Sequence, residues 1–152
     1  MQNLHISKIQ KLELEQCRSL IEASKAEGYD FVERLWNEYE SRDNRFNESG
    51  AILLGAYLDD NLVAIVGLHI DPYLKQATIG RVRHLYVLPT QRRNKIGREI
   101  MLALIEHARQ HFEILTLRTL TEHGDKFYKL LGFTDETRFE NVSHWLNLKS
   151  DT

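Results

Sequence analysis

The sequence has only one cysteine, Cys17, and two prolines, Pro72 and Pro89, among its 152 residues. A single cysteine excludes an internal disulfide and a cysteine-rich zinc site. The apolar helical pattern around Cys17 predicts that this residue packs in the core. The chain also lacks an HExxH motif, so we expect no metal site.

The sequence also lacks a long apolar run. No stretch approaches the roughly 20 residues that a membrane-spanning helix needs, and the N-terminal Met-Gln-Asn-Leu-His is not a signal peptide. We therefore expect a cytoplasmic protein without a membrane partner. With 152 residues, the chain has the size of one domain, so we expect a single domain over residues 1–152 that folds without disulfides or metal.

Charge is unevenly distributed, although the net charge is only −2. Residues 30–60 hold eight acidic side chains against three basic ones. Residues 81–98 hold six basic side chains and no acidic ones: Arg81, Arg83, Arg92, Arg93, Lys95 and Arg98. The first region should attract cations and the second anions. The net charge and the lack of a recognition motif argue against a nucleic-acid partner.

Hydrophobic periodicity predicts a mixed α/β protein. We expect strands at residues 4–9, 51–58, 62–70, 77–88, 113–120, 133–139 and 142–148. We expect helices at residues 13–27, 29–42, 96–111 and 125–131. The turn residues at 59–61 predict a hairpin, and the helix at 96–111 predicts a crossover between two parallel strands. This order favours a central mixed sheet with helices on both faces.

The segment from Leu85 to Gly97 reads LYVLPTQRRNKIG. A strand ends at a proline, and a short basic loop then leads directly into a helix. The first N–H groups of a helix have no acceptor within it, and the helix dipole makes that end positive. The segment therefore predicts an anion site that suits a diphosphate. The sequence contains neither a GxxxxGK[ST] nor a GxGxxG motif, which argues against a P-loop and a dinucleotide fingerprint.

Here the chain resembles the GNAT superfamily of N-acetyltransferases. The central motif of that family is a strand with a Val-x-Pro-like end, then [Arg/Gln]-x-x-Gly-x-[Gly/Ala] at the start of a helix. This chain has Val87-Leu88-Pro89 and then RRNKIG at residues 92–97, with Lys95 where the first glycine is usual. The segment FYKLLGF at residues 127–133 resembles the FYxxxGF segment of the family. Before it, Thr121 replaces a frequent asparagine and Gly124 a usual alanine.

The resemblance, which covers about residues 50–140, implies a GNAT-like acyl-CoA N-acyltransferase fold and an acetyl-CoA-dependent enzyme without a metal. A primary amine of a small molecule or peptide would attack the thioester directly, and Tyr128 would protonate the departing thiolate. The backbone of Leu85 and Val87 would pair with the pantetheine arm. The resemblance implies this cofactor-binding set: Leu85, Tyr86, Val87, Arg92, Arg93, Asn94, Lys95, Ile96, Gly97, Arg98, Thr121 and Phe127.

The residue that accepts the amine proton is not evident. Similar enzymes often place a glutamate or histidine on the strand before Pro89, but strand alternation puts Arg81 and Arg83 there, and an arginine cannot act as a base. The same alternation puts His84 on the other face. Arg81 and Arg83 would instead bind a carboxylate or phosphate of the acceptor, whereas the acidic region at 30–60 would attract a cationic amine. An amino acid satisfies both interpretations.

A second function stays open at this point. The chain could bind acyl-CoA without turning it over, since Lys95 and the missing base depart from the family pattern. Homodimers are common among similar enzymes, but the sequence does not predict one.

Overall fold

A computed structural model describes residues 3–149, which form one six-stranded sheet in the order β1-β2-β3-β4-β5-β6. The strands are β1 (Leu4–Lys8), β2 (Ile52–Leu58), β3 (Asn61–Ile70), β4 (Ile79–Val87), β5 (Ile114–Leu117) and β6 (His144–Asn147). The helices are α1 (Leu14–Ala26), α2 (Phe31–Ser41), the short 3₁₀ helix η1 (Pro89–Gln91), α3 (Ile96–Arg109) and α4 (Glu122–Leu130). Neighbouring strands are antiparallel except for β4 and β5, which are parallel.

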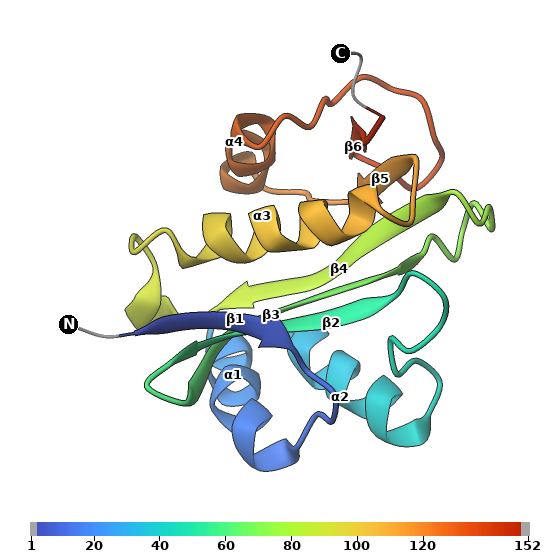
Figure 1. Cartoon of the computed structure of the whole chain (residues 1–152). Helices are drawn as coiled ribbons and strands as arrows, with labels where there is room; N and C mark the ends of the chain where they lie inside the picture. Colours follow the sequence, from blue (N-terminus) through green and yellow to red (C-terminus); the bar gives the residue numbers. More distant parts are fainter. Residues whose placement is uncertain (1–2, 150–152) are drawn as a thin grey trace.

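Helices cover both faces of the sheet, as Figure 1 shows: α1 and α2 lie on one face, and α3 and α4 on the other. Each face has its own apolar core. The α3 side buries Ile100, Met101 and Leu104 of α3 against β2, β3 and β4. The α1/α2 side buries Leu20 and Leu35 against the opposite face of the same strands. The central strands are therefore apolar on both faces, as expected of strands covered on both sides.

The structure confirms the fold class, the hairpin of β2 and β3, and the parallel crossover through α3. Helix α4 begins at Glu122, three residues before the predicted start. No helix among residues 3–149 combines the length and apolar character needed to cross a membrane.

The predicted strand at residues 133–139 was wrong. Only Thr134 pairs with a neighbouring strand, through a single bridge to Trp145. The next residues make other contacts: Asp135 forms an ion pair with Lys129 at 2.9 Å, and the Glu136 carbonyl accepts from Nε1 of Trp145. Beyond Phe133, three of the six residues up to Phe139 are charged and all six are partly or fully exposed, so no apolar face holds this segment against the sheet.

Candidate active site

Strand β4 separates from β5 after the first third of its length. The parallel pairing covers only Ile79, Gly80 and Arg81 of β4, opposite residues 114–116 of β5. Within residues 3–149, β4 then continues to Val87 with β3 as its only strand neighbour. Figure 1 shows β4 extending well past the short β5. The second half of β4, including Leu85 and Val87, therefore has one edge to which an extended ligand can add.

A β-bulge at His84 reorients the strand at the point of separation. Gly67 of β3 faces Arg83, but Ile65 faces Tyr86, so β4 carries an extra residue between them. His84 takes a left-handed conformation with φ of 59°, which is unusual for a non-glycine residue. Bulges of this kind are frequent beside active sites.

The bulge overturns the predicted orientation of His84. Its ring stacks on Phe31 of α2, and its Nε2 lies 3.6 Å from Glu38, also on α2. His84 therefore faces the α1/α2 side, as Arg83 does, because the extra residue breaks strict alternation. Burial, together with the nearby Arg83 and Arg34, lowers the pKa of His84 to about 3, so this imidazole is neutral near pH 7.

The loop after β4 has left-handed backbone at two positions before α3 begins. After η1, Arg93 and Lys95 both have left-handed backbone, with φ of 72° and 62°. Lys95 is the N-cap of α3, and its side chain makes no capping hydrogen bond. The N–H groups of the first turn of α3, residues 96–98, therefore remain available to a ligand. The usual glycine at this position has a physical reason, because left-handed backbone is easier for glycine, but Lys95 adopts it as well.

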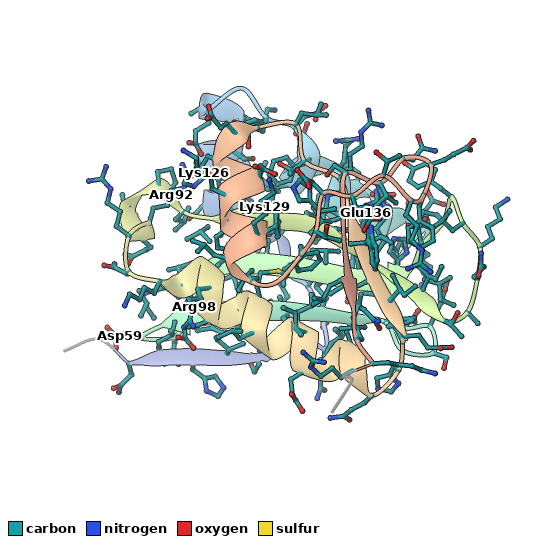
Figure 2. All side chains as sticks on the ribbon, turned by 90° about the horizontal axis from the view of Figure 1, so that it is seen from above. Asp59, Arg92, Arg98, Lys126, Lys129 and Glu136 are labelled. Carbon is teal, nitrogen blue, oxygen red and sulfur yellow. The ribbon has the colours of Figure 1, made fainter. Side chains whose placement is uncertain are left out.

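The cationic side chains around this loop have different roles. Arg92 binds Glu27, the C-cap of α1, through two hydrogen bonds of 2.7 and 2.8 Å. Arg92 also donates to the Val87 carbonyl and lies over the ring of Tyr86. Arg98 lies 3.8 Å from the adjacent Glu99. Figure 2 shows Arg92 and Arg98 at the end of the molecule where α3 begins.

No ion pair involves Arg93 or Lys95 within the described part of the chain, and both side chains are exposed. Among the other predicted loop residues, Asn94 donates to the Gln91 side chain at 3.3 Å. Ile96 is buried in the core. The exposed positive charge of this loop thus comes from Arg93, Lys95 and Arg98, whereas Arg92 connects the loop to α1.

Helix α4 places Phe127 and Tyr128 beside the same end of β4. A Cβ on Gly97 would lie 3.6 Å from the Phe127 ring and 3.6 Å from Val87, so these three residues are neighbours. Tyr128 packs between Phe127 and Phe133 with edge-to-face rings. Burial raises the pKa of Tyr128, so its phenol stays protonated at neutral pH and can donate a proton.

Thr121 and Gly124, the two residues at the start of α4 that differ from the family pattern, depend on each other. Thr121 is the N-cap of α4, and its Oγ1 accepts from the N–H of Gly124 at 2.9 Å. A Cβ on Gly124 would overlap Oγ1 of Thr119. Threonines at 119 and 121 therefore require glycine at 124.

A partly buried network that the sequence did not predict holds α4 against β6. His144 lies with Nε2 2.7 Å from Asp125 of α4 and with Nδ1 2.8 Å from Oγ of Ser143. The Ser143 hydroxyl also accepts from the N–H of Thr119. These contacts fix the position of α4, and thus of Tyr128. The sequence gives no signal for this role of His144, because its partner Asp125 lies 19 residues away along the chain. Glu27 was missed for the same reason, since its partner Arg92 is distant in sequence.

The two predicted substrate-binding arginines have different surroundings. Arg81 is buried, forms an ion pair with Asp71 at 3.2 Å and donates to the Asn141 carbonyl at 2.9 Å. Arg83 is half-buried, and its NH1 donates to Nε2 of His69 at 3.1 Å. Burial and the neighbouring Arg83 lower the pKa of His69 to about 4, so this partner is neutral. Arg83 therefore keeps an unbalanced charge, whereas Arg81 does not.

Residues 3–149 contain no group of three or more side chains that could hold a metal ion. One pair of histidines, His107 and His111, does have the four-residue spacing of helical metal ligands, and the rings lie 4.5 Å apart. His107 Nε2 lies 3.0 Å from the Gly50 carbonyl oxygen. His107 therefore links α3 to the loop before β2.

Comparison with known proteins identifies the fold and the family. The model of the acetyltransferase (GNAT) family matches residues 12–133. A candidate acetyltransferase from Exiguobacterium sp. 255-15 is 28% identical, with a TM-score of 0.82 over 95% of this chain and 93% of that chain. Among curated protein sequences, none matches significantly.

Two more distant structures share the fold and were solved with coenzyme A. The PaiA N-acetyltransferase of Thermoplasma acidophilum is 23% identical, with a TM-score of 0.67 over 95% of this chain and 99% of that chain. An aminoglycoside 6′-N-acetyltransferase is 17% identical, with a TM-score of 0.73 over 97% and 99%. At these identities the likeness concerns the fold. Since the family model matches most of the sequence, the chain belongs to the GNAT family of acetyltransferases.

Proposed function

We propose that the protein transfers the acetyl group of acetyl-CoA to a primary amine of a small molecule or peptide. One observation carries the proposal: the unpaired edge of β4 leads directly into the loop at residues 92–97, where a helix N-terminus and exposed cations meet. Such an edge suits an extended polar arm, and the loop suits a diphosphate. Acetyl-CoA combines these two features with a reactive thioester.

In this proposal the backbone of Leu85 and Val87 pairs with the pantetheine arm, and the N–H groups of residues 96–98 bind the diphosphate. Arg93, Lys95 and Arg98 add positive charge at the same end. Arg92 contributes by a different route, because its bidentate contact with Glu27 holds the loop in place. Phe127 packs beside Gly97 and thereby positions Tyr128.

The proposed reaction is a direct transfer. The neutral amine attacks the thioester carbonyl, a C–N bond forms, the C–S bond breaks, and the nitrogen loses one proton. The leaving thiolate takes a proton from the Tyr128 hydroxyl, which is protonated at neutral pH. The amine proton passes to water, because the buried imidazoles of His69 and His84, with pKa values of about 4 and 3, are too weakly basic to hold it at neutral pH.

Tyr128→Phe tests the proposal, with Tyr57→Phe on β2 as a control away from the site. Acetyl-CoA binding is followed by the shift in melting temperature, and turnover by thiol release with a panel of amines. We expect Tyr128→Phe to lower kcat by about 10²- to 10⁴-fold, the usual contribution of a general acid, while the acetyl-CoA shift remains. Undiminished turnover would refute the role of Tyr128. Binding without turnover in the unaltered protein would instead indicate an acyl-CoA-binding module.

A further inference from the structure

Arg83 lies on the α1/α2 side of β4, away from the loop at residues 92–97. It faces Gly67 across the sheet, one residue before the bulge at His84. The loop begins after Leu88, five residues further along, which corresponds to roughly 15 Å of extended chain. The guanidinium therefore cannot serve the diphosphate, but it lies beside the part of β4 where the strand leaves β5.

Within residues 3–149, no acidic side chain forms an ion pair with Arg83. Two other arginines of this region each bind a carboxylate: Arg81 lies 3.2 Å from Asp71, and Arg92 lies 2.7 Å from Glu27. Among residues 3–149, the contact that Arg83 makes is to the neutral His69. The Glu38 carboxylate raises the pKa of Arg83 through its charge, but the contact it makes is with Nε2 of His84, at 3.6 Å. A half-buried cation that uses one of its five donors on a neutral group can bind an anion.

His69 holds this guanidinium in place without neutralising it. Its Nε2 contacts Arg83 at 3.1 Å, its Nδ1 lies 3.2 Å from the Asn44 amide, and its ring packs edge-on against Phe46. An oriented arginine loses less freedom on binding, and its planar fork matches a carboxylate. Tyr73 is 55% exposed, and the Arg81 guanidinium lies over its ring. This places an exposed aromatic group in the same region.

We infer that the acceptor is a small amine that carries a carboxylate, and that Arg83 binds this carboxylate. The inference rests on the proposed function and specifies the substrate class of the same site. One unbalanced guanidinium matches the single charge of a carboxylate better than the nearly double charge of a phosphomonoester. Arg83 is also adjacent to the bulge, so a bound amino acid places its amine near the unpaired edge of β4.

The test compares the twenty L-amino acids with their C-terminal amides as acceptors, by thiol release from acetyl-CoA. O-phosphoethanolamine tests for a phosphate in place of the carboxylate. We expect kcat/KM of the preferred acid to exceed that of its amide by about 10- to 100-fold, the usual effect of a charge-assisted hydrogen bond. Arg83→Gln should lower kcat/KM of the acid much more than that of its amide, which removes the preference, and the acetyl-CoA shift should remain. Arg83→Lys should keep part of it.

Arg18→Gln is the matched control, since Arg18 is an exposed arginine of α1. Equal rates for acid and amide in the unaltered protein would overturn the inference, as would equal losses on both in Arg83→Gln. It would also be overturned if acetyl-CoA bound but only phosphate-bearing amines, or no member of the panel, were acetylated. The absence of any acetyl-CoA shift has a different meaning, because it would refute the proposed function and this inference with it.

Discussion

Acidification from pH 7 to pH 5 should destabilise the folded protein, largely through two histidines beneath α2. Burial lowers the pKa of His84 to about 3 and that of His69 to about 4, from an unfolded value of 6.5. Below pH 6.5 the unfolded chain takes up protons at these positions, whereas the folded chain stays neutral until its lower pKa is reached. The contribution of these two neutral imidazoles to the free energy of unfolding is therefore complete above pH 6.5 and is lost as the pH falls toward 4.

The size of this effect follows from the pKa values. At pH 5 each histidine is 1.5 pH units below its unfolded pKa, which favours the unfolded state by about 2 kcal/mol. Both together should lower the free energy of unfolding by about 4 kcal/mol. That is a large part of the 5–15 kcal/mol that is typical of native proteins.

Urea denaturation at pH 7 and pH 5 measures this difference. His84→Asn should reduce the pH-dependent loss by about 2 kcal/mol, because asparagine does not titrate and tolerates the left-handed backbone at this position. The same substitution at His123, an exposed histidine of α4, should leave the loss as it is. If His84→Asn lost as much stability as the unaltered protein, His84 would not be a buried neutral imidazole and the packing of α2 on the bulge would be wrong.

Two further predictions concern the backbone around the site. Lys95→Gly should raise the free energy of unfolding by up to about 1 kcal/mol and keep acetyl-CoA binding. Lys95→Val should lower the free energy of unfolding, because left-handed backbone is costly for a branched side chain. The opposite order of stabilities in chemical denaturation would contradict the loop geometry. Gly97→Ala should be neutral or stabilising by up to about 1 kcal/mol, since its Cβ would meet only ordinary contacts within a helix. Gly124→Ala should destabilise by about 1–3 kcal/mol because its Cβ overlaps Thr119. Equal stabilities of these two alanine variants would show that α4 does not begin as described.

The parts of the fold that depend on periodic burial could be predicted from the sequence. The apolar stripe of α3, the β2–β3 hairpin and the parallel crossover all follow from local pattern. The position of the loop at residues 92–97, between a strand and a helix, was also predictable, because Pro89 ends the strand and the apolar stripe of the next helix starts at Ile96. The predicted strand at 133–139 failed because the residues between Phe133 and Phe139 are polar, and among them only Thr134 pairs with another strand.

Contacts between distant residues could not be predicted in the same way. The bulge at His84 depends on the register of β3 against β4, and no residue in RVRHLYV indicates where the extra residue falls. The pairs Arg92–Glu27 and Arg81–Asp71 depend on which carboxylate lies nearby in three dimensions. The sequence therefore predicts the same anion-binding role for Arg81 and Arg83. Only the structure distinguishes them, because Arg81 forms an ion pair with Asp71 and Arg83 contacts His69.

The central claim is that the end of β4 and the start of α3 together bind acetyl-CoA. The most direct test is a titration of the protein with acetyl-CoA, followed by melting temperature, with S-acetylpantetheine as the control that lacks the diphosphate. A ligand at 100 times its dissociation constant adds about 2.7 kcal/mol of stability. We predict a saturable rise with acetyl-CoA and a much smaller one with S-acetylpantetheine. No rise at millimolar acetyl-CoA, or equal rises with both compounds, would contradict the assignment of the loop at residues 92–97 as the diphosphate site.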